Sequence, residues 1–284
     1  MAKNKPKIDP ESKIVADLIE EVKRRKMTRL DIGGAIRLFR NPPPTPKISH
    51  PFSGDHVRYG LVTDNHFASK WTDKRFLEQV YRRFAADKVE AIYNVGDISD
   101  GQHMHKGHEF ELYAHGLDDI AQDIIDDYPS INKVPTYFIE GNHDLSFWKS
   151  EGAHIGKPIA KDRPDMIFLG SEKVDVKIGP EGRTVMRLFH PSKGTAYALS
   201  YHQQKNAENQ RPEEKPNILL VGHYHKLDYL FYRNIHIFQP GTTCEQTNWM
   251  SSKDIVAMMG AMIVDFFVKK NGEVDRIKYS VIKK

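Results

Sequence analysis

Short apolar segments alternate with amphipathic segments over most of the chain. Runs of strand length, largely apolar, lie at residues 56–63, 89–95, 134–139, 185–189 and 218–221. Between the first two runs, apolar side chains at positions 76, 77, 80, 81 and 84 recur at the spacing of one helix face. Residues 109–128 and 196–208 predict two further helices.

The C-terminal part of the chain predicts a β-hairpin. Apolar residues at 262–269 and 274–281 flank Asn271-Gly272, a dipeptide typical of tight hairpin turns. Short apolar strands that alternate with helices predict an α/β fold in which helices cover the sheets.

The first forty residues have a different pattern, which predicts two short helices. Asp9-Pro10 supplies an N-cap and a first-turn proline for one helix, and Thr28 would cap another. Prolines at 42, 43, 44 and 46 then form a stiff spacer. We therefore expect a basic helical extension over residues 1–40, a proline-rich linker over 41–54, and one large domain over 55–284.

Charge is distributed unevenly along the chain. The net charge is +4, but residues 1–50 hold 12 Lys and Arg against 6 Asp and Glu, whereas the other 234 residues hold 30 against 32. A short basic segment attached to a slightly acidic body is typical of an enzyme with an electrostatic handle for a polyanion. The alternative is a solvated basic helix with no partner.

Cysteine content and hydropathy indicate the compartment. The single cysteine, Cys244, excludes a disulfide framework and any zinc site built from several thiolates. The N-terminal residues contain no apolar signal segment, and the longest apolar run, residues 255–264, is about half a membrane span. We expect a cytoplasmic protein that does not interact with a membrane.

Each of the predicted strands is followed by side chains that bind metal ions. The segments are Asp64-Asn65-His66, Gly96-Asp97-Ile98-Ser99-Asp100, Gly141-Asn142-His143-Asp144, His190, and Gly222-His223-Tyr224-His225. Side chains that follow strands gather at the carboxyl edge of an open α/β sheet, where such proteins bind ligands. Carboxylate, amide and imidazole donors together suit Mn, Fe, Zn or Ni better than Ca or Mg.

The number of donors predicts two metal ions. The candidates are Asp64, His66, Asp97, Asn142, His190, His223 and His225. Seven donors are too many for one ion but suit two ions that share a carboxylate, and Asp97 after Gly96 is the best candidate to bridge them. Two metal ions about 3.5–4 Å apart can clamp the attacking and leaving oxygens of an in-line displacement at phosphorus.

These five motifs, in this order, resemble those of the calcineurin-like metallophosphoesterase superfamily over about residues 56–282. The resemblance implies a four-layer α/β/β/α sandwich. It implies that one metal ion binds Asp64, His66, Asp97 and His225, and that the other binds Asp97, Asn142, His190 and His223. It also implies that His143 is the general acid and that Asp144 holds its ring.

Details of the motifs distinguish branches of the superfamily. The Ser/Thr protein phosphatases of the superfamily resemble one another in a glutamate at the end of the third motif and an Asp-Arg-Gly run after the second. This chain has Asp144 and Asp100-Gly101-Gln102 at these places, which disfavours a protein phosphatase. The pattern is closer to the DNA-repair nuclease branch and to the cyclic-nucleotide phosphodiesterase branch. His190-Pro191 and residues 194–197 are also similar to phage-encoded phosphoesterases.

Together these features predict a metal-dependent phosphodiesterase, in the first place a nuclease that hydrolyses DNA or RNA by means of a hydroxide shared between two metal ions. Manganese is the expected metal, with Fe, Ni, Zn or Mg as alternatives, and nucleic acid is the expected partner. One alternative is an esterase of small molecules such as cyclic nucleotides, and another is a non-catalytic binding protein with a relic site.

Three further polar residues lie at the end of the second motif or just after it. Asp100 either orients a metal-bound water or caps the next turn. His103 and His105, with His108 and His115 beyond them, either contact the substrate phosphate or lie on a solvated loop.

Overall fold

The computed structural model divides the chain into two units, Met1–Thr45 and Pro46–Lys284. It describes residues 47–50, 54–179, 182–192, 194, 198–210 and 214–284, together with the backbone of 27–33 and 35–40. The helix predicted near Asp9 lies outside these residues. The boundary between the units falls within the predicted linker. No helix in the part of the chain that the structure describes is long and apolar enough to cross a membrane.

The second predicted helix of the N-terminal unit is wrong. Residues Met27–Gly33 form β1 and residues Ala35–Arg40 form β2, an antiparallel pair in which Leu30 is opposite Leu38 and Ile32 is opposite Ile36. Apolar and polar residues alternate with a period of two on both sides of the Gly33-Gly34 pair, which is a hairpin pattern. Thr28 was expected to cap a helix but lies within strand β1, as the alternation of apolar and polar residues indicates.

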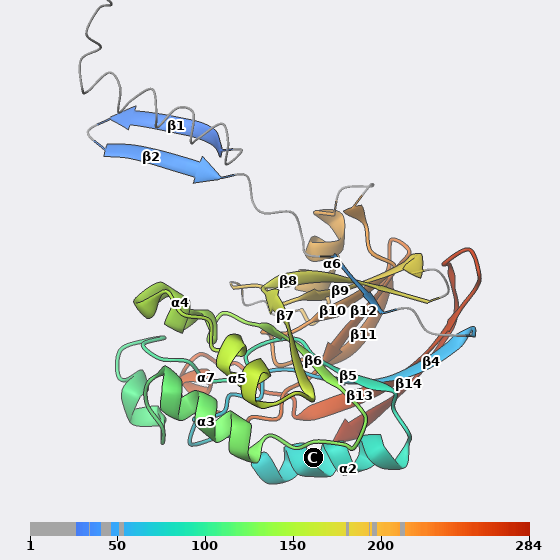
Figure 1. Cartoon of the computed structure of the whole chain (residues 1–284), viewed down its shortest axis with the longest axis horizontal. Helices are drawn as coiled ribbons and strands as arrows, with labels where there is room; N and C mark the ends of the chain where they lie inside the picture. The colour runs from blue at the N-terminus through green and yellow to red at the C-terminus, as the bar shows by residue number, and fades with distance from the viewer. Residues whose placement is uncertain are drawn as a thin grey trace, which may run out of the picture. The chain divides into compact units, whose positions relative to one another are not determined.

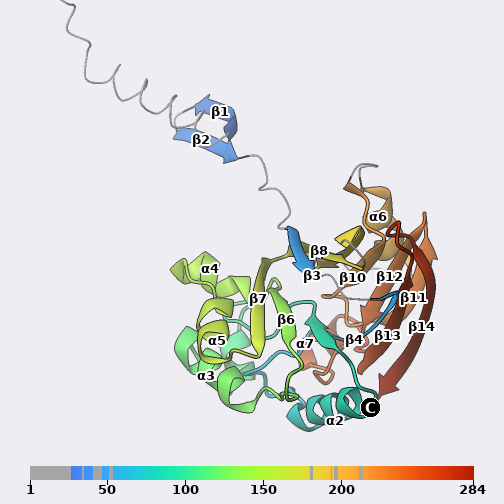
Figure 2. The same ribbon diagram turned by 45° about the vertical axis from the view of Figure 1, so that its right-hand side comes forward.

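The large unit contains two six-stranded sheets (Figures 1 and 2). The first has the order β14 (Val274–Lys283), β13 (Gly260–Val268), β4 (His56–Val62), β5 (Ala91–Asn94), β6 (Thr136–Glu140), β7 (Met166–Ser171). The second has the order β11 (Leu227–Tyr232), β12 (Ile235–Pro240), β10 (Ile218–Val221), β9 (Thr184–Phe189), β8 (Lys173–Ile178), β3 (Lys47–His50).

Parallel pairing brings the ends of the motif strands together. Strands β4, β5 and β6 run parallel in the first sheet, and β9 and β10 run parallel in the second. All five predicted strands are therefore confirmed, and their carboxyl ends lie along one edge of each sheet. The predicted C-terminal hairpin is confirmed as β13 and β14.

Helices cover the outer face of each sheet, and short helices also lie in the loops that follow β5 and β12. The helices of the described residues are α2 (Lys74–Ala86), the 3-10 helix η1 (His108–Glu111), α3 (Leu117–Asp127), α4 (Leu145–Glu151), α5 (Gly156–Asp162), α6 (Tyr201–Glu208) and α7 (Asn248–Ser252). Apolar residues of α2, α3 and α5 pack with the first sheet, whereas Ala207 of α6 packs with the second. The layers are helices, sheet, sheet and helix, as the α/β prediction required (Figure 1).

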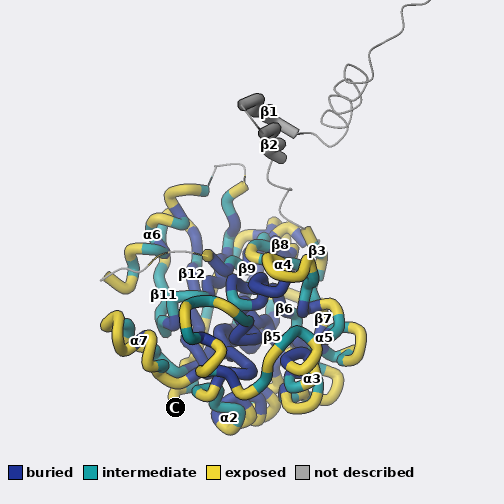
Figure 3. Tube along the Cα trace, turned by 90° about the vertical axis from the view of Figure 1, so that its left-hand side faces the viewer, coloured by how far each residue is buried: buried dark blue, intermediate teal, exposed yellow. Residues whose placement is uncertain are grey.

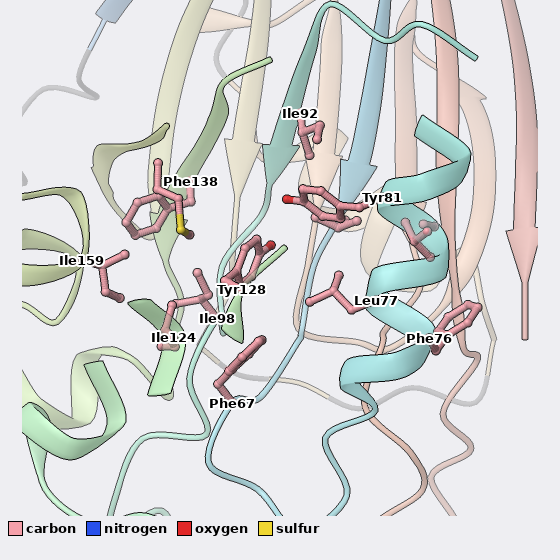
Figure 4. Packing of buried hydrophobic residues seen from close by; sticks show 14 of the residues in the cluster. Phe67, Phe76, Leu77, Tyr81, Ile92, Ile98, Ile124, Tyr128, Phe138 and Ile159 are labelled. Atoms are coloured by element: carbon pink, nitrogen blue, oxygen red, sulfur yellow. The ribbon is translucent and has the colours of Figure 1, made fainter. Parts of the chain in front are cut away.

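The central strands β4, β5, β6, β9, β10 and β13 are mostly buried on both faces. One core lies between the two sheets, and another lies between the first sheet and its helices, where Leu77 and Tyr81 of α2 point toward Tyr128 (Figure 4). The middle of the unit is consequently buried, whereas the outer surfaces of α3 and α7 are exposed (Figure 3). Strands covered on both faces consist of nearly continuous apolar runs, which explains the sequence pattern.

Three element boundaries differ from the prediction. Residues 47–50, assigned to the linker, form β3, because Ile48 packs into the core between the sheets and the His50 ring lies 4.1 Å from the Tyr137 ring, centroid to centroid. The helix predicted over 109–128 is interrupted, since Gly116 has φ +81° and α3 begins after it. The helix predicted over 196–208 is confirmed only as α6.

Close packing of α2 on β4 depends on the absence of a side chain at Gly60. A Cβ there would lie 2.7 Å from Cε2 of the fully buried Phe84. Gly60→Ala should therefore lower the free energy of unfolding by about 1–3 kcal/mol in urea titrations. Adding Phe84→Leu should recover part of that loss relative to the sum of the single variants. Wild-type stability in Gly60→Ala, or simple additivity of the two changes, would contradict this account.

Candidate active site

The five motifs meet at the adjoining carboxyl edges of the two sheets. The motif that carries Asp64 follows β4, the one that carries Asp97 follows β5, and the one that carries Asn142 follows β6. His190 follows β9, and the motif of His223 follows β10. All of these side chains, except the half-buried His223 and His143, are buried. The structure thus brings together residues separated by as many as 161 positions, since His225 Nε2 lies 3.3 Å from Asp64 Oδ1.

The backbone at five of the seven expected ligands is in the left-handed region. Its φ is +52° at Asp64, +50° at His66, +49° at Asp97, +76° at His223 and +52° at His225. Residues other than glycine seldom adopt this conformation, which costs about 1–3 kcal/mol each and is concentrated at functional sites. Each sharp turn points a side chain back across the sheet edge.

Glycines in the motifs allow neighbouring turns to approach closely. A Cβ at either Gly96 or Gly222 would lie 2.6 Å from Nδ1 of His190. The backbone of both turns therefore packs directly against this imidazole, and no other residue would fit.

One cluster of possible metal ligands consists of Asp64, His66 and His225. His225 Nε2 lies 3.3 Å from Asp64 Oδ1 and 3.1 Å from His66 Nε2. His66 donates from Nδ1 to Asp100 Oδ1 at 2.8 Å, so its Nε2 is an acceptor that faces the cluster. Two imidazole nitrogens and a carboxylate oxygen thus converge on one point.

A second cluster consists of Asp97, His190 and His223. His190 Nε2 lies 3.0 Å from Asp97 Oδ2, and His223 Nδ1 lies 2.8 Å from Asn142 Oδ1. The two clusters adjoin, since His190 Nε2 is 4.0 Å from Asp64 Oδ1. The seven predicted donors are therefore gathered in one place, as two groups.

The donor set fits divalent metal ions. His190 donates from Nδ1 to the Val95 carbonyl at 2.6 Å, and its buried Nε2 makes no hydrogen bond among the described residues. An imidazole that is fixed through one nitrogen and directs the other toward a carboxylate, here Asp97 at 3.0 Å, is a usual arrangement of a metal ligand. Oxygen and imidazole donors of this kind suit first-row transition metals.

Charges in the site shift the pKa values of its members. Burial raises the pKa of Asp97, but the charges of His190 and His143 outweigh this and hold it well below its usual range. Burial lowers the pKa of His190, but Asp97 raises it to about 9. Burial and the charge of His190 lower the pKa of His223 to about 3. A metal ion that binds His190 must therefore displace a proton from it at neutral pH.

The ring of His143 is held by Asp100. Its Nδ1 donates to the Asp100 carbonyl at 2.7 Å and lies 3.2 Å from Asp100 Oδ1, which leaves Nε2 for a substrate. Burial lowers the pKa of His143, but Asp97 and the hydrogen bond with Asp100 raise it to about 10. His143 is therefore protonated at neutral pH in the metal-free protein, as a proton donor must be.

The prediction that Asp144 holds this ring is wrong. The Asp144 carboxylate is fully buried and accepts hydrogen bonds from the backbone N–H groups of Ile98, Ser99 and Gly141 and from the Ser99 hydroxyl. It ties the second motif to the third. Burial and the charge of Asp97 raise its pKa to about 7.

Asp100 is a centre of contacts, and sequence reasoning missed one of its partners. Its Oδ1 accepts from His66, and its Oδ2 lies 3.3 Å from Nε2 of His108. His108 is buried, whereas His103 and His115 are exposed, as expected of a solvated loop. No spacing signal separates His108 from its neighbours, because its burial depends on the course of the loop.

A cavity of about 240 Å³ opens beside the two clusters. Its polar floor includes Asp97, Asn142, His143, His223 and His225. His105 lines it, while the exposed His103 does not. Another part of the lining, here called the wall, consists mostly of apolar side chains. The arrangement can thus hold cations beside a protonated imidazole at the base of a pocket large enough for part of a small organic group.

Comparisons with known proteins identify a family and relatives that the chain resembles. The family model described as the calcineurin-like phosphoesterase superfamily domain matches residues 57–259. The DNA polymerase II small subunit of Archaeoglobus fulgidus is 25% identical over 267 residues, which cover 77% of this chain and 52% of that protein. The chain thus spans about half the length of this curated relative.

Solved structures with a similar course of the chain are more distant. An archaeal phosphodiesterase is 11% identical, with a TM-score of 0.44, and the match covers 80% of this chain and 100% of that one. Vacuolar Protein Sorting 29 from Cryptosporidium parvum is 16% identical, with a TM-score of 0.41 and coverage of 81% and 100%. The E. coli phosphoesterase Yfce is 15% identical, with a TM-score of 0.40 and coverage of 78% and 98%.

Removal of the Asp100 charge should lower the pKa of His143. In Asp100→Asn the carboxylate that faces the imidazolium is replaced by a neutral amide, so the protonated form loses part of its stabilisation. NMR titration of the His143 ring in metal-free protein should show deprotonation at lower pH than in the wild type.

Asp119→Asn, which removes an exposed charge from α3, provides the control and should leave the titration unchanged. An unaltered His143 titration in Asp100→Asn would show that Asp100 does not hold the proton on this ring.

Proposed function

Since the chain belongs to the calcineurin-like phosphoesterase superfamily, and is therefore a hydrolase that acts on phosphoric esters, we propose that it is a metal-dependent phosphodiesterase that cleaves DNA. The observation that carries the metal-dependent part is the pair of adjoining clusters, in which Asp64 Oδ1 and His190 Nε2 are 4.0 Å apart. Adjoining clusters of this kind are suited to two ions acting on one phosphoryl group.

In this proposal Asp64, His66 and His225 hold one ion, and His190, His223 and Asn142 hold the other, with Asp97 shared. Two divalent ions at these positions would activate a water molecule and neutralise the charge that develops on the phosphoryl oxygens. Manganese suits the mixture of oxygen and imidazole donors, and Fe, Ni, Zn or Mg are the alternatives.

The protein residues supply the proton and the positioning. His143 donates the proton on Nε2 to the leaving oxygen, while Asp100 fixes its ring through Nδ1. Asp144 holds the turns that carry Asp97 and His143 at a constant separation through their backbone N–H groups. The backbone N–H of His143 also donates to Asp97 Oδ1 at 2.8 Å, so acid and shared carboxylate are positioned by one turn.

DNA is the proposed substrate for three reasons. The motifs resemble those of the nuclease branch as well as those of the cyclic-nucleotide phosphodiesterase branch, and the curated relative is named as a DNA polymerase subunit. The basic residues of positions 1–50 would interact with the phosphate backbone independently of sequence.

We place the protein in the cytoplasm because its only cysteine, Cys244, is buried and free.

One observation favours a small substrate such as a cyclic nucleotide. Among the described residues that line the cavity, Lys226 is the only Lys or Arg, and its Nζ donates to the Val256 carbonyl at 2.9 Å. A strand of nucleic acid would thus depend on cations outside the cavity. A non-catalytic relic is disfavoured because all seven donors are present and converge.

A substrate panel tests this proposal. With Mn²⁺, we expect cleavage of single- or double-stranded DNA with a higher kcat/KM than that of cyclic nucleotides or a bis-aryl phosphodiester. Replacement of Lys23, Arg24, Arg25 and Lys26 by Gln should weaken DNA binding and reduce the log–log salt slope by up to about 3. The same variant should hydrolyse the bis-aryl diester at the wild-type rate.

Asp97→Asn provides the metal-site control and should be inactive on every substrate. Turnover of small diesters without any binding of DNA would favour the small-molecule alternative. Full activity of Asp97→Asn would instead overturn the assignment of the metal ligands.

The proposed role of His143 predicts a dependence on the leaving group. His143→Gln should slow hydrolysis of diesters with alkyl leaving groups by about 10²–10⁴-fold, because these need protonation as they depart. Aryl esters with acidic leaving groups should lose much less. The measurement is kcat/KM for a series of diesters of graded leaving-group pKa, and a uniform loss across the series would rule out the general-acid role.

A further inference from the structure

The wall of the cavity opposite the polar floor is apolar. It is formed by Met104, Leu199, Trp249, Met250 and Ile255. Leu199 and Trp249 are 47% and 40% exposed, so large apolar surfaces face the opening rather than the core. A site that needed only to hold inorganic phosphate would gain nothing from such a wall, because exposed apolar surface of this size is usually a binding surface.

The wall is held in place by its own hydrogen bonds. Thr247 is the N-cap of the short helix α7, and its Oγ1 accepts a hydrogen bond from the Met250 N–H at 3.1 Å. Gln246 Oε1 accepts from the Ala257 N–H at 2.8 Å, and Lys226 donates to the Val256 carbonyl, so both ends of the segment are anchored. The Met250 side chain is buried beneath the helix, which leaves Trp249 on the side of the cavity.

The Trp249 ring lies against His105, which comes from the loop after β5. The two ring centroids are 5.9 Å apart and the planes differ by 16°, so the rings are stacked, and we call this pair the Trp249–His105 platform. Nδ1 of His105 lies 3.2 Å from the Lys106 carbonyl and Nε2 lies 3.4 Å from Glu111, so contacts within its own loop hold the His105 ring against Trp249. Trp249 is 40% exposed, which leaves part of the indole open to a ligand.

We propose, on the basis of the nuclease function above, that the Trp249–His105 platform stacks one nucleobase of the nucleotide attached to the scissile phosphate. A nucleobase is flat and aromatic, and stacking stabilises its binding without requiring cationic groups. The polar floor and the platform line the same cavity, so a phosphate held at the floor would carry its base against the wall.

The proposed stacking of a base determines which form of DNA the protein would cleave. A base inside a duplex is stacked on its neighbours and paired, and it must leave the helix to reach such a platform. The favoured substrate is accordingly a single-stranded or frayed end. Stacking is tolerant of sequence, so no strong base preference is expected.

Oligonucleotides with and without the relevant base test the proposal. The wild type should cleave single-stranded DNA with an intact base next to the scissile phosphate about 5- to 150-fold more efficiently than the same strand with an abasic nucleotide there. Trp249→Ala should reduce this preference to near one, whereas Trp249→Phe should retain most of it. Trp148→Ala, which removes an exposed tryptophan of α4, is the matched control and should keep the full preference.

A binding measurement separates failure of this proposal from failure of the proposed function. A mononucleotide or a short single strand added to the metal-free protein should quench tryptophan fluorescence in the wild type and in Trp148→Phe, but not in Trp249→Phe. Quenching by the mononucleotide alone, without cleavage of any DNA, would support the platform but assign it to a small nucleotide. Equal quenching in Trp249→Phe, or an abasic preference unchanged in Trp249→Ala, would overturn the platform.

Discussion

The structure depends on the burial of two carboxylates, Asp64 and Asp97, at one point between two sheets. Both side chains are almost wholly inaccessible to solvent. Isolated buried charges of the same sign would destabilise the fold by many kcal/mol, so positive charge must lie close to them. His143 and His190, whose pKa values are raised to about 10 and about 9, provide it in the metal-free protein, and divalent cations would provide it more completely. The need to compensate these charges accounts for most of the unusual features nearby.

Those features act together to hold the loops in one arrangement. Left-handed backbone at the candidate ligands points their side chains inward, and glycines at 96 and 222 allow the turns to pack against His190. Asp144 then ties the loop of Asp97 to that of His143 through backbone N–H groups. A site built in this way is rigid before any ligand arrives, and such preorganisation is what electrostatic stabilisation of a charged transition state requires.

The cavity beside this rigid floor has a different character. Its wall comes from three segments, the loop after β5, the residues before α6 and the loop that contains α7. Loops of this kind vary without disturbing the sheets that position the candidate catalytic groups. Under the proposals above, the floor would supply the chemistry and the wall with Trp249 would determine the choice of substrate.

The sequence alone was sufficient for the strands and the α/β class, and it placed the seven candidate donors at the ends of strands, because each motif follows an apolar run and parallel strands align their carboxyl ends. It was misleading where a local signal competed with a longer-range one. Thr28 suggested a helix in what is a hairpin, and residues 47–50 were assigned to a linker although Ile48 packs into the core between the sheets. Only the tertiary structure decided that Asp100 rather than Asp144 holds His143, that His108 is buried beside it, and that Trp249 meets His105. Contacts between segments distant along the chain depend on the course of loops, and residue spacing does not encode that course.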